Sequence, residues 1–190
     1  MSLYTLALFA HLLGVLGLFI AMGLQWTMTL QIRRARTIAQ VREWGSLAKG
    51  LRWLNPVTGV LIIGAGIYMF VTAWSITTPW IVVSLAAMLL MMVFGMGIAG
   101  RRMKPIQQAA RAAAPSAETI PAELQRRIHD PLLWIGTQLA ASTALGIVLM
   151  MTVKPDLGVS LLVVGVAIAL GLVAALLTQG SAQPQEIPAL

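Results

Sequence analysis

Residues 3–30 read LYTLALFAHLLGVLGLFIAMGLQWTMTL and contain one residue that titrates near neutral pH, His11. The stretch is long enough to cross a bilayer as a helix. An ionisable side chain at membrane depth is costly and usually faces other helices or a cavity. Helical steps of three and four residues place a titratable ring, a glycine and an amide on one face: His11, Gly14, Leu18, Met22 and Gln25. We therefore expect this face to pack against the rest of the protein.

The composition is that of a polytopic membrane protein. Of the 190 residues, 58% are hydrophobic and 10% are charged, and several apolar runs exceed roughly 18 residues, the length typical of a spanning helix. The sequence predicts an all-α membrane protein, a bundle of five transmembrane helices at 3–30, 55–74, 79–100, 131–153 and 157–178. We expect a single integral membrane domain over 1–180 and a polar, disordered tail at 181–190.

Three of the predicted spans start at a short polar residue followed by a proline. The pairs are Asn55-Pro56, Thr78-Pro79 and Asp130-Pro131. A short polar side chain can cap the first turn of a helix, and proline suits the first helical position because its missing N–H has no partner there anyway. We expect each pair to begin a helix.

Positive charge indicates the topology. Twelve of the thirteen Lys and Arg residues lie in two alternate loops, 31–54 and 101–130, and basic loops stay in the cytoplasm. We expect the N-terminus outside and the C-terminus inside, with anionic lipid at the two basic loops. The same distribution argues against nucleic-acid binding. Residues 101–114 are expected to prolong the third span, and 121–128 to form a short helix.

The absent residue types exclude several kinds of site. The chain has no cysteine, so disulfides, thiolate metal sites and covalent haem attachment are impossible. A haem would have to be held non-covalently. The predicted spans contain no acidic residue in their interiors, which argues against a carboxylate-based proton or cation carrier. The N-terminal run is too long for the apolar region of a cleaved signal peptide, and no basic segment precedes it.

His11 is the first candidate for chemistry. It lies about eight residues into the first span, or roughly 12 Å deep at 1.5 Å per residue. A neutral imidazole there could ligate haem iron or copper, or relay a proton. The alternative is a histidine that forms a hydrogen bond across a helix interface and does no chemistry.

Lys154 and Tyr68 are the other candidates, both on the outer side of the membrane in the predicted topology. Pro155 should end the fourth span at Lys154. The lysine could serve a site shared with His11, or it could only extend its charge to the headgroups. Tyr68 could donate to a ligand or belong to the aromatic belt at the interface. His129, on the basic side, is expected to be a solvated residue.

The remaining polar and sulfur-containing residues of the spans have simpler interpretations. Gln138 and Ser142 are expected to form hydrogen bonds between helices. Methionines concentrate in the third and fourth spans, at 88, 91, 92, 96, 150 and 151. Thioethers suit Cu(I) and can ligate haem, but these residues step around the helix, as packing residues do.

Two stretches resemble a known group of proteins. AHLLGVLGLFIAMGLQW at 10–26 and VLMMTVKPD at 148–156 resemble small bacterial inner-membrane proteins related to the copper-resistance D (CopD) proteins and the HemJ-type protoporphyrinogen oxidases. The HemJ resemblance implies that His11 and Lys154 take part in haem b binding and porphyrinogen oxidation. The CopD resemblance implies passage of copper across the membrane. Both resemblances imply a location in a bacterial cytoplasmic (inner) membrane.

The leading hypothesis is a haem-binding membrane protein in which His11 is an axial ligand and Lys154 is the second ligand or a partner of a haem propionate. Spans one and four would then be neighbours. A b-type cytochrome and a HemJ-like oxidase both fit this site, so whether the protein is an enzyme stays open. The alternatives are a copper or small-solute permease that uses His11 and methionines, and a non-catalytic membrane subunit. A homo-oligomer or a partner subunit in the membrane is compatible with all three.

Overall fold

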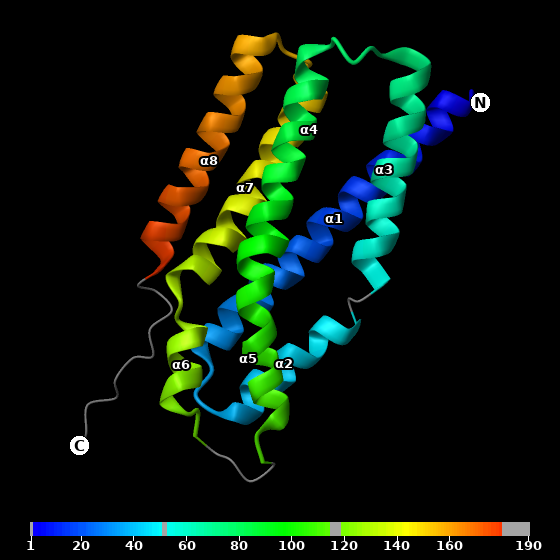
Figure 1. Cartoon of the computed structure of the whole chain (residues 1–190). Helices are drawn as coiled ribbons and strands as arrows, with labels where there is room; N and C mark the ends of the chain where they lie inside the picture. Colours follow the sequence, from blue (N-terminus) through cyan, green and yellow to red (C-terminus); the bar gives the residue numbers. More distant parts are fainter. Residues whose placement is uncertain (1, 51–52, 115–118, 180–190) are drawn as a thin grey trace.

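A computed structural model describes residues 2–50, 53–114 and 119–179 of the chain, with the side chains of 47–50 left aside. These residues form helices joined by short turns (Figure 1): α1 (Leu3–Arg34), α2 (Ile38–Gly50), α3 (Leu54–Ala73), α4 (Pro79–Met92), η2 (Val93–Gly100), α5 (Arg101–Ala112), α6 (Ala122–Ile128), α7 (Pro131–Val153) and α8 (Leu157–Gln179). The described ranges contain no strand, only an isolated bridge between Thr37 and Thr119.

The predicted all-α fold with five spans is confirmed. Five helical segments are long and apolar enough to cross a membrane. The third is one continuous helix of 34 residues, Pro79–Ala112, made of α4, the π-helical η2 and α5. The expected extension beyond residue 100 is therefore present, as is the short helix α6. The predicted tail at 181–190 lies outside the described residues.

The proline pairs predict the helix starts in two of three cases. Asp130 caps α7 and accepts a hydrogen bond from the Leu132 backbone N–H at 2.9 Å. Thr78 is at the N-cap of α4, although its side chain makes no capping hydrogen bond. The expectation for Asn55-Pro56 is wrong because α3 already begins at Leu54. Proline is tolerated throughout the first turn, where no backbone N–H needs an intrahelical partner.

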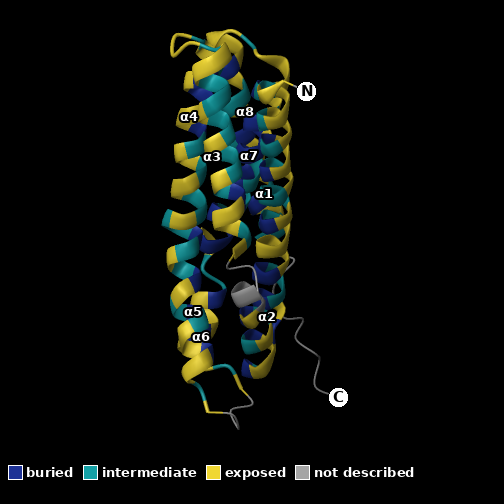
Figure 2. Cartoon of the chain, turned by 90° about the vertical axis from the view of Figure 1, so that its right-hand side faces the viewer, coloured by how far each residue is buried: buried dark blue, intermediate teal, exposed yellow. Residues whose placement is uncertain are grey.

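The spans form two packing groups. α3 packs along α1, whereas α7 lies between α8 and the continuous α4–η2 helix. In Figure 1, α3 and the first half of α1 stand to one side, and α4, α7 and α8 to the other. Burial follows this arrangement. Of an 18-residue apolar stretch in each span, 56% is buried in the span that contains α7 but only 6% in α3. Exposed residues cover much of α3 and α4 (Figure 2).

Small residues lie where the helices approach most closely. A methyl group added at Gly14 of α1 would lie 2.8 Å from Ile62 Cγ1 of α3, and one at Gly17 would meet the Thr58 side chain. A methyl group at Gly136 of α7 would lie 2.9 Å from the Phe94 carbonyl oxygen of η2. Between membrane helices apolar burial gives little driving force, so close packing of small residues decides which helices pair.

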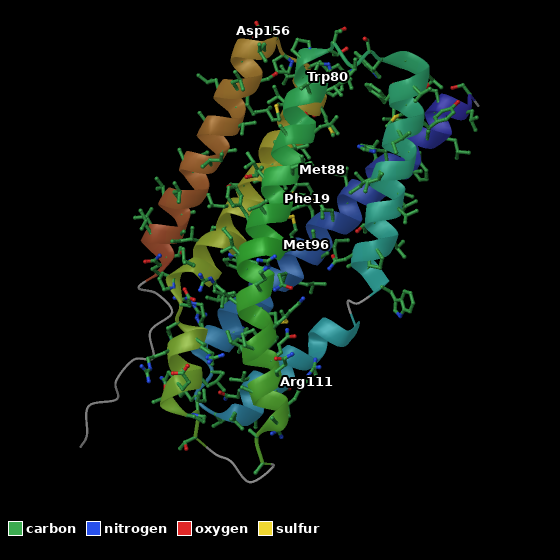
Figure 3. The ribbon with its side chains drawn as sticks, viewed as in Figure 1. Phe19, Trp80, Met88, Met96, Arg111 and Asp156 are labelled. Carbon is green, nitrogen blue, oxygen red and sulfur yellow. The ribbon has the colours of Figure 1, made fainter. Side chains whose placement is uncertain are left out.

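The two ends of the bundle differ in chemistry. Arg111 lies at one end, and Trp80 and Asp156 lie at the other (Figure 3). We call the end that holds α2, α5, α6 and the junction of α1 with α7 the basic end, because it carries Arg33, Arg34, Arg101 and Arg102. We call the other the opposite end.

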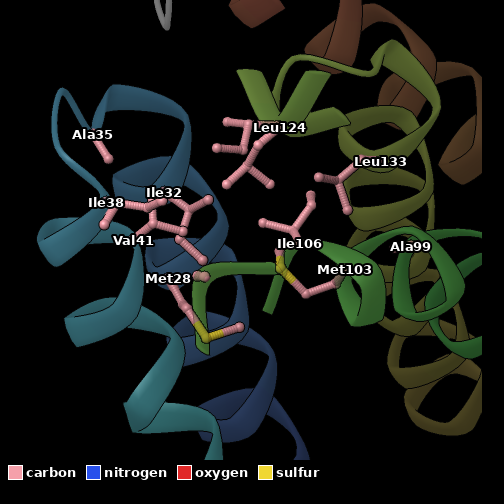
Figure 4. Packing of buried hydrophobic residues seen from close by; sticks show 12 residues of the cluster. Met28, Ile32, Ala35, Ile38, Val41, Ala99, Met103, Ile106, Leu124 and Leu133 are labelled. Atoms are coloured by element: carbon pink, nitrogen blue, oxygen red, sulfur yellow. The ribbon is translucent and has the colours of Figure 1, made fainter. Parts of the chain in front are cut away.

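The basic end has its own apolar core. Twelve buried residues from the last turns of α1, from α2, η2, α5 and α6, and from the start of α7 pack together there (Figure 4); Ile32, Ile106 and Leu133 are fully buried. Arg42 of α2 joins α2 to the end of α5, because its Nε and Nη2 donate to the carbonyl oxygens of Ala110 and Ala113 at 3.1 and 2.9 Å. This core holds the amphipathic helices against the ends of the spans.

Candidate cofactor site

His11 is buried between α1 and α3, with 8% of its surface exposed. Its Nδ1 lies 3.0 Å from the backbone carbonyl oxygen of Ile62 in α3. A carbonyl oxygen only accepts hydrogen bonds, so Nδ1 carries the proton and donates. In the neutral imidazole, the other ring nitrogen, Nε2, carries the lone pair. Histidines that ligate metals are commonly held in this way, with one ring nitrogen donating to a carbonyl and the other left as the ligand.

The α3 backbone supports the imidazole ring at Gly66. A methyl group added at Gly66 would lie 3.5 Å from both Cε1 and Nδ1 of His11, which is ordinary van der Waals contact. Gly66 follows Ile62 by one turn and lies on the same face of α3. The ring therefore rests against one face of α3, which also supplies its hydrogen-bond acceptor.

The predicted stripe of α1 is confirmed at its start and drifts afterwards. His11 and Gly14 are buried, but the next buried positions are Ala21 and Met28, while Gln25 is exposed. A spacing of seven residues matches two helices that cross at a shallow angle and stay in contact over several turns. The sequence pattern predicts instead one straight stripe against which the rest of the protein packs.

Lys154 lies at the opposite end of the bundle, where α7 stops. Its backbone is left-handed, with φ 54° and ψ 54°, and it is the one non-glycine residue of positive φ in the described chain. Its Nζ lies 4.8 Å from the centroid of the Trp74 ring, at the end of α3. Trp74 also packs edge-on against Trp80, with ring centroids 5.1 Å apart. The exposed lysine thus contacts a pair of packed tryptophans at this end of the bundle.

The structure does not bring His11 and Lys154 together. The two side chains contact α3 at Ile62 and at Trp74, which are twelve residues apart, or about 18 Å along a helix at 1.5 Å per residue. Two axial ligands of one iron must both reach the metal, so this separation does not suit Lys154 as the second ligand. α1 contacts α7 instead at the basic end, where Trp26 Nε1 donates to Gln138 Oε1 at 2.9 Å.

Tyr68 is half-buried on α3 between these two levels. It follows Ile62 by six residues, a rotation of about 240° at 100° per residue, so it lies on a different face of α3 from the acceptor of His11. The structure therefore does not place Tyr68 beside the imidazole.

The interhelical role predicted for Gln138 is confirmed by its hydrogen bond with Trp26. The same prediction is wrong for Ser142, whose hydroxyl donates to the Leu139 carbonyl oxygen of its own helix at 3.2 Å. A hydroxyl on a helix can always reach a carbonyl one turn back, and this local bond competes with any partner on another helix.

Four of the six methionines in spans three and four meet in one cluster. Met88 and Met91 of α4 and Met150 and Met151 of α7 pack together with Val83, Ala87 and Ile147. Met92 and Met96 are exposed instead. The described residues contain no group of three or more His, Cys, Asp or Glu side chains that could hold a metal ion.

Sequence reasoning missed Arg33. It was grouped with the loop charges, but it lies inside α1 with 3% of its surface exposed, and its guanidinium lies 5.4 Å from the centroid of the Trp134 ring of α7. The signal was present in the spacing: Arg33 follows Trp26 by seven residues, so the face that meets α7 continues past the end of the apolar run.

The fold defines a multi-pass integral membrane protein, and its helices will contact lipid. The chain belongs to the family described as "Predicted integral membrane protein (DUF2269)", which it matches over residues 5–155. This range runs from α1 to the end of α7 and includes His11, Tyr68 and Lys154. No curated protein and no solved structure matches the chain.

Proposed function

We propose that the protein binds haem b non-covalently and that His11 is an axial ligand, as the resemblance to the HemJ-type proteins implies. One observation supports this most directly: the Nδ1–H of His11 donates to the Ile62 carbonyl oxygen, which leaves Nε2 as a base at membrane depth. A donated hydrogen bond of this kind orients the ring and raises the basicity of the ligating nitrogen. Haem, when bound, supplies one-electron redox chemistry.

The other residues take roles that their positions allow. Gly66 keeps the ring against α3, and the glycine contacts of α1 hold the two helices together. Lys154 is proposed as a partner of a propionate, because propionates lie at the edge of a porphyrin and do not have to reach the iron. A lysine ammonium forms charge-assisted hydrogen bonds with carboxylates.

Visible absorption of the detergent-purified protein, oxidised and dithionite-reduced, tests this proposal. We expect a Soret band that shifts on reduction in the wild type and is absent in His11→Ala. His11→Gln is the variant that separates ligation from folding, because its amide can still donate to Ile62 but provides no imidazole. His129→Ala is the matched control: His129 Nδ1 also lies 3.0 Å from a carbonyl oxygen, that of Gln125, but at the basic end.

The outcomes are distinct. Loss of the band in both His11 variants, with the band kept in His129→Ala, supports the proposal. A colourless wild-type protein from cells supplied with haem, or a band that persists in His11→Ala, contradicts it.

A second candidate is passage of copper, as the CopD resemblance implies. The observation that favours it is the meeting of four methionines from α4 and α7 in one cluster, because thioethers are ligands that suit Cu(I). Copper analysis of the protein under reducing conditions tests it, with Met88→Leu and Met91→Leu beside the exposed control Met96→Leu. Binding of Cu(I) that depends on the clustered positions and not on Met96 would support a permease.

The positive charges also support a proposal for orientation and location. We propose that the basic end faces the cytoplasm of a bacterial inner membrane and meets anionic headgroups, because basic loops stay on that side. Labelling of single cysteines introduced at exposed positions of the two ends, Ser75 and Arg111, tests it. Only the cysteine at Ser75 should react with an impermeant reagent added to whole cells stripped of their outer membrane.

A further inference from the structure

A buried cation with two unpartnered nitrogens lies where α1 meets α7 at the basic end. Arg33 is 3% exposed, and among the residues that the structure describes its Nε and Nη1 are buried with no hydrogen-bond partner. A buried polar group without a partner costs free energy, and the cost is larger for a charge. The guanidinium lies over the face of Trp134, 5.4 Å from the ring centroid. An aromatic face attracts a cation but cannot accept its N–H groups as an oxygen would.

The carboxylate of Asp130, near Arg33, already binds two other groups. Asp130 acts electrostatically on Arg33, but its Oδ2 pairs with Arg102 and its Oδ1 accepts the backbone N–H of Leu132. Two guanidinium groups therefore share one carboxylate, which leaves an excess of one positive charge in this group of three. An anion with its own acceptor oxygens would balance this charge and accept the N–H groups of Arg33, whereas water would supply acceptors alone.

The position of Arg33 indicates the source of such an anion. Trp134, which lies against the guanidinium, also packs against Trp26, about two turns before Arg33 in α1, with ring centroids 5.9 Å apart. Tryptophan collects at the level of the headgroups. Basic pockets between spanning helices at this level bind anionic lipid headgroups. The guanidinium is planar and presents its N–H groups in a fork that matches phosphate oxygens.

We propose that Arg33, between α1 and α7, binds a phosphate oxyanion, and that the phosphate belongs to an anionic phospholipid. Arg102 adds positive charge beside it, and Trp26 and Trp134 border the site on the side of the bilayer. This site is separate from the His11 region, which lies twenty-two residues away on α1, or about 33 Å along the helix. The proposal therefore does not depend on haem binding.

Native mass spectrometry of the lipid-stripped protein, titrated with dioctanoyl phosphatidylglycerol, tests the proposal. The wild type should take up one molecule more tightly than any further ones. Arg33→Met keeps a long apolar side chain and removes the N–H groups, and we expect at least about tenfold weaker binding because a hydrogen bond to a charged group contributes about that much affinity. Arg34→Met is the matched control: it removes the same charge from the next residue, which is exposed.

Two further probes identify the ligand. Dioctanoyl phosphatidylcholine should bind more weakly, because its choline brings a positive charge beside Arg102. Inorganic phosphate, added as a competitor, distinguishes the sources: failure to displace the lipid assigns the site to a headgroup, and displacement at equal concentration assigns it to free phosphate.

Two results would overturn the proposal: equal binding by Arg33→Met and the wild type, or an equal loss in Arg34→Met, which would indicate diffuse charge attraction. Where Arg33→Met does not elute as the wild type does in size exclusion, Arg33→Lys decides, because it keeps the charge and loses the fork. Unchanged affinity in Arg33→Lys then counts against the site, and weaker binding supports it.

Discussion

Gly14→Ala should weaken the contact between α1 and α3 that holds His11 in place. A methyl group at this position would lie 2.8 Å from Ile62 Cγ1 and 3.0 Å from both the Ile62 backbone nitrogen and Leu61 Cβ. Rotation of the Ile62 side chain can relieve only the first of these contacts, so the helices must move apart. Gly23→Ala is the matched control, because it makes the same change in the same helix where nothing lies within 4 Å.

The expected magnitude follows from the difference between the two variants. Replacing a glycine inside a helix by alanine gains roughly 0.5–1 kcal/mol in both, so this gain cancels. What remains is the cost of overpacking at Gly14, about 1–3 kcal/mol. We therefore expect Gly23→Ala to be slightly more stable than the wild type, and Gly14→Ala to be less stable than Gly23→Ala by the full overpacking cost.

Far-UV circular dichroism during unfolding by sodium dodecyl sulfate in mixed micelles measures the free energy of unfolding of both variants. The two free energies should differ by at least about 1 kcal/mol, the lower bound of an overpacking cost. If Gly14→Ala is as stable as Gly23→Ala, α1 and α3 do not pack as described, and the argument for the His11 hydrogen bond fails with it.

Three further changes should alter stability in the same assay. Lys154→Gly should be more stable than Lys154→Ala by about 1 kcal/mol, because both lose the contact with Trp74 and only glycine adopts the left-handed backbone at no cost; equal stabilities would contradict the positive φ. Asp130→Asn should lower stability by about 1 kcal/mol through loss of its charge beside Arg102, and Asp130→Ala should lower it further by loss of the α7 cap. Trp26→Phe should cost about 1 kcal/mol by removing the donor to Gln138, and a double variant with Gln138→Leu should cost no more than the single changes summed.

The number of spans could be predicted because it depends on properties that local sequence carries. A helix in lipid must satisfy its own backbone hydrogen bonds, so a sufficiently long apolar run has one available conformation. The extension of the third span to Ala112 and the short helix α6 followed from alanine content and helix-breaking residues in the same way. In each case the neighbouring residues alone determine the structure.

The pairing of the helices could not be predicted, because apolar side chains meet lipid and protein equally well. Gly14 and Gly23 look alike in the sequence, but one lies in close contact with α3 and the other faces open space. We expected α1 beside α7 along the span, but it packs along α3 and reaches α7 at the basic end. The difference depends on which surfaces fit closely, and hydropathy does not report shape.

Only part of the candidate site could be predicted from the sequence: the importance of His11, but not which residues lie beside it. The cost of burying an imidazole in lipid singles out His11 from sequence alone, and the structure gives it an acceptor on another helix. The sequence suggests a partnership between His11 and Lys154 because both residues lie toward the outer side of the membrane. Depth in the membrane does not show which helices are neighbours, so it could not show whether the two side chains meet. Arg33 was missed because a charged residue after an apolar run is usually solvated. In the structure α1 continues to Arg34, and this places the Arg33 side chain against the ring of Trp134.

Helix α1 contacts two different helices, one near each of its ends. Near one end, His11 and Gly14 join α1 to α3, and near the other, Trp26 and Arg33 join it to α7. α3 has its main contact with α1 alone, so α1 connects α3 to the rest of the bundle. Gly14 and Trp26 lie twelve residues apart, or about 18 Å along the helix, and share no partner. Changes at sites this far apart usually add, so the free-energy losses of Gly14→Ala and Trp26→Phe should sum in the double variant. A loss clearly smaller than the sum would show instead that the two sites are coupled through α1.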